Sequence, residues 1–371
     1  MNPKYQPLFE PYTLNNGVRV KNRLTVAPMT HFASNEDGSL SEQERRFLQH
    51  RATDFGLFIT AATLVAKGGK AFAGQPEAVA EKDLPSLREV ARIIQGQGAK
   101  AILQIHHGGA LSLPELNDRV TAPSAINGAE ALTEQEVQDL VNAFAHATEL
   151  AIRAGFDGVE IHGANAYLIQ QFYSAQTNLR TDPWGEPLAF PLAVVDAVIA
   201  VREKHQRPDF ILGYRFSPEE AGEKGLTMKE TLSLVDGLME KSLQYLHVSL
   251  WDFYKKVRRG ADTNLARMAA IHQRTVGKIA LIGVGNLFSA DQVLAAYQTG
   301  WAEFIDVGKT VMLNPQFAKL IADGRENEIV VELDPARPDH YGIPDHLWQL
   351  CVQGGDWLPP LKGKGWQPLD I

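Results

Sequence analysis

Eight short segments rich in apolar, β-forming residues recur along the chain, separated by stretches in which apolar residues repeat with helical spacing. Strands that alternate with helices pair in parallel through helical crossovers. Eight such units within roughly 300 residues predict an α/β protein of the (β/α)8 TIM-barrel type. A doubly wound open sheet is the alternative architecture. The predicted strands are residues 23–28, 57–62, 101–106, 158–162, 210–216, 245–249, 278–283 and 303–307.

Four of the helical stretches begin with a capping-box pattern. In this pattern a Ser or Thr and a Glu or Gln three residues later satisfy each other's backbone N–H groups, which fixes where a helix starts. The four pairs are Ser41 with Glu44, Thr133 with Glu136, Thr227 with Glu230, and Ser289 with Gln292.

Three regions lie outside the strand and helix repeat, within what we expect to be a single domain over residues 1–371. The motif Asn15-Asn16-Gly17 predicts an N-terminal hairpin over residues 12–20, placed to close the bottom of the barrel. Residues 107–130 form a long insertion after the third strand, which we expect to overhang the active face. Residues 323–371 form a proline-rich C-terminal tail with three tryptophans, which we expect to pack on the barrel or on a partner subunit.

Composition argues against several classes of protein. The 36 Lys and Arg residues against 44 Asp and Glu residues give a net charge of −8, so we expect no nucleic-acid or membrane partner. Cys351 is the only cysteine, which excludes an intrachain disulfide and cysteine-ligated zinc or iron–sulfur sites, and we expect no metal. The N-terminus lacks the apolar stretch of a signal peptide, and no apolar run approaches ~20 residues. We therefore expect a soluble, cytoplasmic protein.

Polar or otherwise reactive side chains stand at the ends of the first five predicted strands, where barrel enzymes place their chemistry. Any one of them alone would be explained by a structural hydrogen bond. Five consecutive strands ending in this way indicate a site. The residues are Pro28, Met29 and Thr30 after the first strand, Ala62 and Thr63 after the second, Gln104, His106 and His107 after the third, His162, Asn165 and Tyr167 after the fourth, and Arg215 after the fifth.

The last two strands are followed by glycine-rich loops, Gly283-Val284-Gly285-Asn286 and Gly308-Lys309. Glycines let backbone N–H groups approach an anion, and the loops after strands seven and eight commonly hold phosphate in these barrels. Lys309 adds a cation at the same place. These loops predict a phosphate site at Gly285, Gly308 and Lys309, although tight turns alone could also explain the glycines.

A ligand extending from that phosphate across the mouth would meet Gln104 and Arg215 on the far side. Gln104 can donate and accept hydrogen bonds along a heterocycle edge, and Arg215 can stabilise negative charge on a reduced ring. Flavin mononucleotide (FMN) has these features. An ion pair between Arg215 and Glu219 or Glu220 is the structural alternative.

At this point the sequence resembles the old yellow enzyme family of FMN-dependent NADH:flavin oxidoreductases and ene-reductases. The most specific part is the His-x-x-Asn-x-Tyr string within residues 159–168, followed by Asn-x-Arg-x-Asp-x-Trp-Gly at residues 178–185. The other matching segments are residues 22–30, 61–63, 103–105 and 215–217, together with the paired glycine loops.

The resemblance implies roles for individual residues. It implies that Pro28, Met29 and Thr30 line the flavin, that Ala62, Gln104 and Arg215 hold its polar edge, and that Gly285, Gly308 and Lys309 bind its phosphate. It further implies that His162 and Asn165 grip the oxygen of an electron-withdrawing group and that Tyr167 is the proton donor. Two positions depart from the family pattern: Lys309 stands where arginine is commoner, and His106-His107 occupies a variable position.

The implied function is an oxidoreductase that takes hydride from NADH or NADPH and reduces activated C=C bonds, such as those of enones. Hydride would pass from flavin N5 to the β-carbon, with two preset donors on the carbonyl oxygen and Tyr167 protonating the α-carbon. A non-redox, phosphate-binding TIM-barrel aldolase or isomerase is the alternative. The nicotinamide preference, the small-molecule substrate, a homo-oligomer and the role of the basic run 255–259 are left open.

Overall fold

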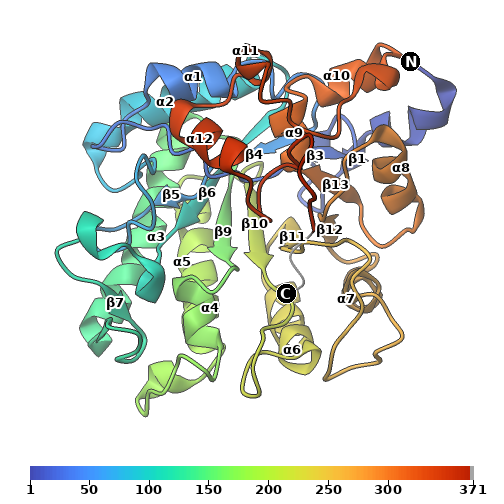
Figure 1. Ribbon diagram of the computed structural model, residues 1–371. Helices are drawn as coiled ribbons and strands as arrows, with labels where there is room; N and C mark the ends of the chain where they lie inside the picture. Colours follow the sequence, from blue (N-terminus) through green and yellow to red (C-terminus); the bar gives the residue numbers. More distant parts are fainter. Residues whose placement is uncertain (368–371) are drawn as a thin grey trace.

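The barrel predicted from the strand repeat is present in a computed structural model, which describes residues 1–367. Eight parallel strands pair in the order β4-β3-β13-β12-β11-β10-β9-β6, and pairing between β4 and β6 closes the barrel (Figure 1). This closure confirms the TIM barrel and excludes the open sheet. The strands are β3 Leu24–Val26, β4 Leu57–Ile59, β6 Lys100–His106, β9 Gly158–Gly163, β10 Ile211–Phe216, β11 Tyr245–Val248, β12 Ala280–Gly283 and β13 Phe304–Val307, with the short β5 Thr63–Leu64 beside β6.

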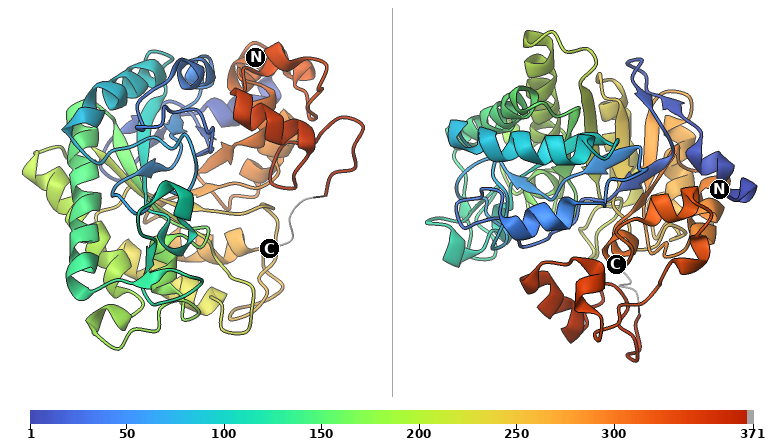
Figure 2. Two further views of the ribbon diagram at one scale, coloured as in Figure 1. Left: turned by 60° about the vertical axis from the view of Figure 1, so that its left-hand side comes forward. Right: turned by 90° about the horizontal axis from the view of Figure 1, so that it is seen from above.

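Helices surround the barrel and connect its strands (Figure 1). Figure 2 shows the orange-to-red helices of the C-terminal part together on one flank. The helices are α1 Glu42–Leu48, α2 Leu84–Gln95, α3 Glu134–Ala154, α4 Leu168–Tyr173, α5 Ala189–Lys204, α6 Met228–Met239, α7 Arg267–Thr275, α8 Ala290–Gln298, α9 Lys309–Leu313, α10 Phe317–Ala322, α11 Pro338–Tyr341 and α12 Asp345–Gln353.

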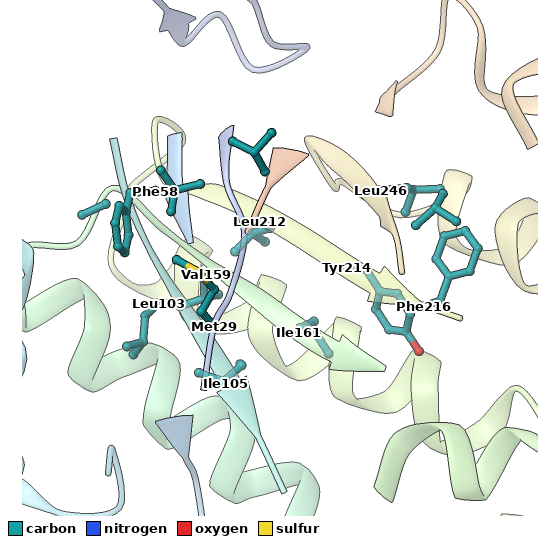
Figure 3. Packing of buried hydrophobic residues seen from close by; sticks show 14 of the residues in the cluster. Met29, Phe58, Leu103, Ile105, Val159, Ile161, Leu212, Tyr214, Phe216 and Leu246 are labelled. Carbon is teal, nitrogen blue, oxygen red and sulfur yellow. The ribbon is translucent and has the colours of Figure 1, made fainter. Parts of the chain in front are cut away.

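Alternation along the strands divides the core into two parts. Every second residue of a strand points away from the barrel axis, and apolar residues at these positions, among them Leu103, Ile161 and Leu212, pack against the helices (Figure 3). The residues between them point into the barrel, and some of these, among them Ile102 and Ile211, form a second cluster in its lower interior. Nearer the carboxyl ends, inward positions of five of the strands are polar and lead to the mouth: Gln104, Glu160, Arg215, His247 and Asp306.

The predicted hairpin forms and closes the lower end of the barrel. Strands β1 Tyr12–Thr13 and β2 Arg19–Val20 pair antiparallel. Leu14 and Val20 are buried in the same cluster as Phe304 of β13. The hairpin therefore covers the lower end of the barrel.

Three of the four predicted capping boxes form, at Thr133, Thr227 and Ser289. The fourth is only half formed. Ser41 accepts a hydrogen bond from the N–H of Glu44 (3.1 Å), but the Glu44 carboxylate accepts the Ser34 hydroxyl (2.7 Å) and pairs with His31 (3.3 Å). Glu44 is buried, so its carboxylate takes these two partners in place of the helix start.

The insertion and the tail both carry small elements of their own. Strand β7 Thr121–Ala122 of the insertion pairs with β8 Glu130–Ala131, and short 3-10 turns at Gly109–Leu111 and Pro114–Leu116 precede it. The tail packs on the chain's own barrel, where Arg51 donates a hydrogen bond to the carbonyl of Tyr341. The last four residues of the predicted tail and domain, 368–371, lie outside the described residues. Within residues 1–367, no helix is long and apolar enough to cross a membrane.

Candidate active site

The carboxyl ends of the strands surround a cavity at the mouth of the barrel. Eight of the predicted site residues line it, whereas Ala62, Gln104, His162 and Tyr167 are not among its lining residues. His162 is the register partner of Arg215 across β9 and β10, which places it next to the cavity wall. The eight lining residues are Pro28, Met29, Thr30, Asn165, Arg215, Gly285, Gly308 and Lys309.

The loops after β12 and β13 form the predicted phosphate end. Lys309 Nζ donates a hydrogen bond to Asn286 Oδ1 (2.9 Å) and lies over the indole rings of Trp251 (5.0 Å) and Trp366 (4.8 Å). Burial in this cage lowers the pKa of Lys309 to about 8. The cation is thus held in place by aromatic rings, with a single side-chain oxygen as a hydrogen-bond acceptor.

The two glycines after β12 are constrained for different reasons. A Cβ on Gly283 would lie 2.6 Å from the ring of Phe253, so this glycine serves packing. Gly285 has φ +143°, lines the cavity, and leaves no room for a Cβ because the backbone of Phe253 lies 2.4 Å from where it would stand. Packing therefore explains Gly283, while Gly285 has a backbone conformation that favours glycine and also exposes backbone to the cavity.

Arg215 does not form the alternative ion pair with Glu219 or Glu220. Glu219 binds Arg267 (2.6 Å), and Glu220 accepts the amide of Gln170 (2.6 Å). Arg215 is instead buried at the cavity wall, and its Nε has no hydrogen-bond partner among residues 1–367. Its charge faces the barrel interior and the mouth.

Gln104 is fixed by a buried carboxylate below it. Its Nε2 donates to Oε1 of Glu160 at 2.8 Å, and its backbone N–H donates to the Thr60 hydroxyl (3.0 Å). A primary amide has a second N–H and a carbonyl oxygen. The second N–H and the carbonyl oxygen of Gln104 are therefore available to form hydrogen bonds with the edge of a ligand above the strand.

The two predicted oxygen-binding residues are both oriented as donors. Nδ1 of His162 accepts the backbone N–H of Ala164 (3.2 Å), so the ring proton resides on Nε2. Oδ1 of Asn165 accepts the hydroxyls of Ser249 (2.8 Å) and Ser217 (3.3 Å), which leaves Nδ2 to donate. Burial, and then the charges of neighbouring groups, hold the pKa of His162 well below its usual value, so the ring is neutral at pH 7.

The backbone turns sharply at this point because Asn165 and Ala166 both have φ +58°. Such a left-handed conformation is unfavourable for alanine and usually marks a functional site. The turn brings the Asn165 side chain across to β10 and β11, beside the predicted proton donor Tyr167.

Tyr167 is mostly buried, and that burial raises the pKa of its hydroxyl above the usual value. Its ring contacts two imidazoles edge to face, His106 at 4.4 Å and His162 at 5.2 Å between ring centroids. These contacts fix the ring, and the hydroxyl stays protonated at neutral pH.

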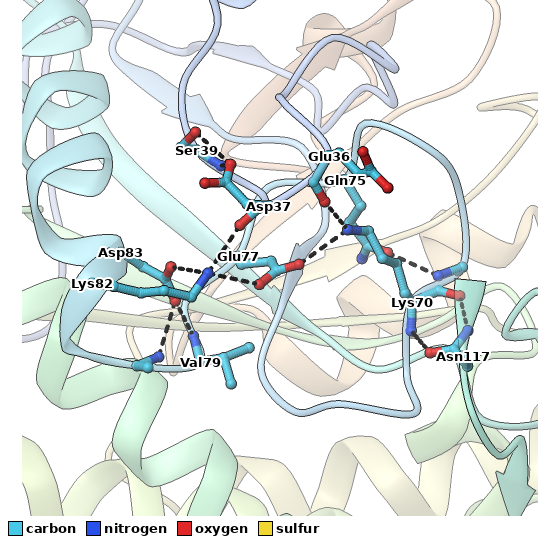
Figure 4. Close-up of polar contacts among 12 residues, drawn as sticks. Glu36, Asp37, Ser39, Lys70, Gln75, Glu77, Val79, Lys82, Asp83 and Asn117 are labelled. Carbon is cyan, nitrogen blue, oxygen red and sulfur yellow. Dashed lines mark hydrogen bonds and ion pairs between the residues drawn. The ribbon is translucent and has the colours of Figure 1, made fainter.

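His106 is oriented by Gln75, whose Nε2 lies 3.0 Å from His106 Nδ1 and whose Oε1 accepts the N–H of Ala71. The same Nε2 contacts the carbonyl of the predicted site residue Ala62 (3.1 Å). Figure 4 shows Gln75 on a loop that Lys70 fastens through its ion pair with Glu77 (3.0 Å). Burial lowers the pKa of His106 to about 3, so its imidazole is neutral at pH 7.

His107 has a different environment. Its Nδ1 accepts a hydrogen bond from the backbone N–H of Gly109 (3.1 Å) within the insertion.

The basic run 255–259 is used in part to hold the neighbouring loop. Arg259 donates to the carbonyls of Gly222 (2.6 Å) and Gly225 (2.8 Å), and the backbone N–H groups of Arg258 and Arg259 donate to Glu219. These contacts give Arg259 a structural role.

Sequence reasoning missed three buried ionisable residues inside the barrel: Glu160, His247 and Asp306. They occupy inward positions of β9, β11 and β13, directly below the mouth. The signal was available, because a charged residue at an inward position of a buried strand needs a partner. It also missed Ser249, although Ser249 ends the sixth predicted strand, and Gln75, whose partners are distant in sequence and which no local pattern identifies.

The donor set fits FMN. Three buried nitrogen atoms around the mouth lack a hydrogen-bond partner within residues 1–367: Arg215 Nε, Asn286 Nδ2 and His106 Nε2. Unsatisfied buried donors are rare in proteins. An anionic, acceptor-rich ligand with a phosphate at one end and carbonyl groups at the other would supply acceptors at both ends of this cavity.

The chain is similar to known flavin oxidoreductases. Residues 7–328 match the family described as NADH:flavin oxidoreductase / NADH oxidase. The probable NADH-dependent flavin oxidoreductase YqiG of Bacillus subtilis (strain 168) is 48% identical over 370 residues, covering 97% of this chain and 99% of that protein. The NADH:fumarate oxidoreductase of Klebsiella pneumoniae (strain 342) is 35% identical and covers 93% of this chain, which spans only 39% of that protein.

Solved structures agree. Morphinone reductase in complex with tetrahydroNAD superposes with a TM-score of 0.75 at 26% identity, covering 91% of this chain and 96% of that one. The old yellow enzyme homologue from Zymomonas mobilis superposes with a TM-score of 0.76 at 22% identity, covering 91% of this chain and 98% of that one, a likeness in fold.

Proposed function

Because this chain belongs to the FMN-dependent NADH:flavin oxidoreductase / NADH oxidase family, of the old yellow enzyme type, we propose that it uses NAD(P)H to reduce activated C=C bonds. When bound, FMN supplies two-electron transfer between the nicotinamide and the acceptor. The observation that carries the proposal is the pair of preset donors, His162 and Asn165, beside a protonated tyrosine.

The cofactor is held from two ends. Lys309 and the backbone at Gly285 and Gly308 would hold the phosphate, and Gln104 and Arg215 would hold the polar edge of the ring. The remaining contacts line the ring, and we assign them to Pro28, Met29, Thr30 and Ala62.

His162 and Asn165 bind the carbonyl or equivalent oxygen of the acceptor. Reduction at the β-carbon of an enone places negative charge on that oxygen, and N–H donors already aimed at it stabilise the charge without reorganisation. The neutral state of His162 suits this role because its Nε2 proton is held there by the Ala164 contact at Nδ1.

Tyr167 gives its hydroxyl proton to the α-carbon. Its raised pKa keeps the proton available through neutral pH, and an enolate-like carbon is basic enough to take it. The proton returns to Tyr167 from solvent before the next turnover.

NADH is the reductant that we propose, because the 48% identical relative carries an NADH-dependent name. The NADPH dehydrogenase of Geobacillus sp. (strain WCH70) is 30% identical over 83% of this chain. The specificity constants for the two nicotinamides, measured with one acceptor, decide between them, and a preference for NADPH would contradict this choice.

A non-redox aldolase or isomerase gains no support from the site. A Schiff-base aldolase needs a lysine free to attack a carbonyl. Lys309, the lysine that lines the cavity, is instead caged by two indoles and hydrogen-bonded to Asn286.

Steady-state kinetics test the function. Since the nicotinamide and the acceptor occupy the same face in turn, we expect parallel double-reciprocal lines when NADH and an enone are varied together. Lines that intersect, requiring both substrates at once, would contradict the shared position. Enones, nitro compounds and quinones should each reoxidise the NADH-reduced enzyme if they are accepted.

A further inference from the structure

A chain of three buried ionisable groups crosses the barrel interior beneath the mouth. Oε2 of Glu160 lies 2.9 Å from Nδ1 of His247, and Nε2 of the same imidazole lies 3.1 Å from Oδ2 of Asp306. Tyr245 donates to Oε2 of Glu160 (3.0 Å), and Gln104 donates to Oε1. The side chains of the three groups are fully buried.

Glu160 is well satisfied, but Asp306 is not. Within the described residues 1–367, neither carboxylate oxygen of Asp306 accepts a well-aligned hydrogen bond, and Thr25 Oγ1 and Arg215 Nε nearby also lack partners. Asp306 and Arg215 both line the cofactor cavity. The unsatisfied end of the chain therefore faces the place where FMN would bind.

The charges around Asp306 come from several strands. His247 on β11 and Arg215 on β10 are positive neighbours, and Glu160 on β9 is negative. With Asp306 ionised, two negative and two positive groups balance, and with Asp306 protonated the set carries one net positive charge. Other titratable groups around this set are Tyr245 of β11, His162 of β9, Tyr167 beyond the end of β9, and Lys309 of α9.

Burial governs how these groups titrate. It raises the pKa of Asp306 above the usual value, although the charge of His247 opposes this. Burial would lower the pKa of His247, but the Glu160 and Asp306 carboxylates together outweigh it, and the net direction is upward. Of the two carboxylates, Asp306 is therefore the one that takes up a proton more readily.

We propose that Asp306 binds a proton when FMN at this site is reduced, so that the Glu160, His247 and Asp306 chain compensates the negative charge that reduction adds. The inference rests on the proposed function. Asp306 acts through the electrostatic field at Arg215 and the cavity, as a charge-compensating residue, and takes no part in contacts with the acceptor.

The step balances in atoms and electrons. NADH is oxidised to NAD⁺ and gives up two electrons and one proton, which the cofactor receives. A second proton comes from solvent through the cavity and forms an O–H bond at a carboxylate oxygen of Asp306. No bond in the protein breaks, and the proton returns to solvent when the acceptor is reduced.

The midpoint potential of the holoenzyme as a function of pH tests this. Each proton taken up per two electrons contributes about 30 mV per pH unit. We expect a slope near 60 mV per pH unit for the wild type and near 30 mV for Asp306→Asn, which keeps the shape of the side chain but cannot ionise. The potential of the variant should exceed that of the wild type at alkaline pH, and the gap should close as pH falls.

The control is Asp83→Asn, which alters a buried carboxyl that binds the backbone N–H groups of Val79 and Ala80 outside the cavity (Figure 4). It should leave the wild-type slope unchanged. Equal slopes in the wild type and in Asp306→Asn would overturn the inference.

A second measurement keeps the inference testable if Asp306→Asn fails to fold. The reduced-minus-oxidised infrared spectrum of the wild-type holoenzyme should gain the carbonyl band of a protonated carboxyl, shifted when aspartate is labelled with ¹³C. An absent band overturns the inference. An enzyme that binds FMN and is reduced by NADH but lacks the band leaves the proposed function intact, whereas failure to bind FMN contradicts the proposed function itself.

Discussion

Three polar residues at the mouth owe their orientation to specific hydrogen-bond partners: Asn165 to Ser249, His162 to a backbone N–H, and His106 to Gln75. At the scale of single residues, the sequence motif supplies the functional side chains and the contact that orients His162, but the hydrogen bonds that orient Asn165 and His106 come from distant segments of the chain. A donor that is already oriented loses little energy when charge develops on its ligand. The chemistry at each residue therefore depends on a second residue.

Tyr167→Phe separates proton donation from shape. The variant keeps the ring and its contacts with both imidazoles but removes the hydroxyl proton. We expect reoxidation of the NADH-reduced enzyme by an enone to slow by about 10²- to 10⁴-fold, with reduction by NADH nearly unchanged. Stopped-flow absorbance measures both half-reactions, and equal slowing of the two would show that Tyr167 only shapes the site.

Lys309 makes FMN binding depend on pH. Its pKa of about 8 means that the apoprotein loses this cation as pH rises above 8, while a bound phosphate favours the charged form. The dissociation constant of FMN should therefore increase above pH 8, by up to about tenfold per pH unit. Lys309→Arg stays charged throughout that range and should show a flat profile. Fluorescence titration of the apoprotein measures both, and matching profiles would contradict this role.

Whether a functional residue can be predicted from the sequence depends on how near its partners lie along the chain. The glycine loops and the His162, Asn165 and Tyr167 set are local patterns, and the eight strands identify the mouth on which they meet. Asp306 and His247 are separated by 59 positions, so their 3.1 Å contact becomes visible only when β11 and β13 are placed in one barrel.

At the scale of elements, alternation along a strand explains why one position must be glycine. Gly213 of β10 faces the interior, and a Cβ there would lie 2.1 Å from the ring of Tyr245 on the neighbouring strand. The missing side chain lets the tyrosine ring cross above β10 and reach Glu160. The sequence predicts the strand but not this requirement, because the space is taken by a residue from another element.

Substitution of two glycines tests that packing. Gly213→Ala forces the Tyr245 ring to move and should lower the free energy of unfolding by about 1–3 kcal/mol. Gly237→Ala on α6, where the nearest atoms to a Cβ lie 3.7 Å away, should raise it by about 0.5–1 kcal/mol because alanine favours the helix. Urea denaturation measures both, and a Gly213→Ala protein as stable as the wild type would contradict the packing argument.

At the scale of the whole molecule, the repeat of eight strands and helices determines the barrel, and the barrel determines which ends of the strands meet. The sequence therefore predicted the architecture, the plug formed by the hairpin, and the cavity wall. It did not predict that the tail would place Trp366 over Lys309, because nothing local in residues 323–371 indicates which surface they cover.

The central claim is that FMN lies across the mouth, with its phosphate at one rim and its polar ring edge at the other. A crystal structure of the holoenzyme tests this most directly. We predict the phosphate at Gly285, Gly308 and Lys309, and the polar edge of the ring within hydrogen-bond distance of Gln104 and Arg215. Electron density for FMN at any other place, with Gln104 and Arg215 directed away from the ring, would contradict the account.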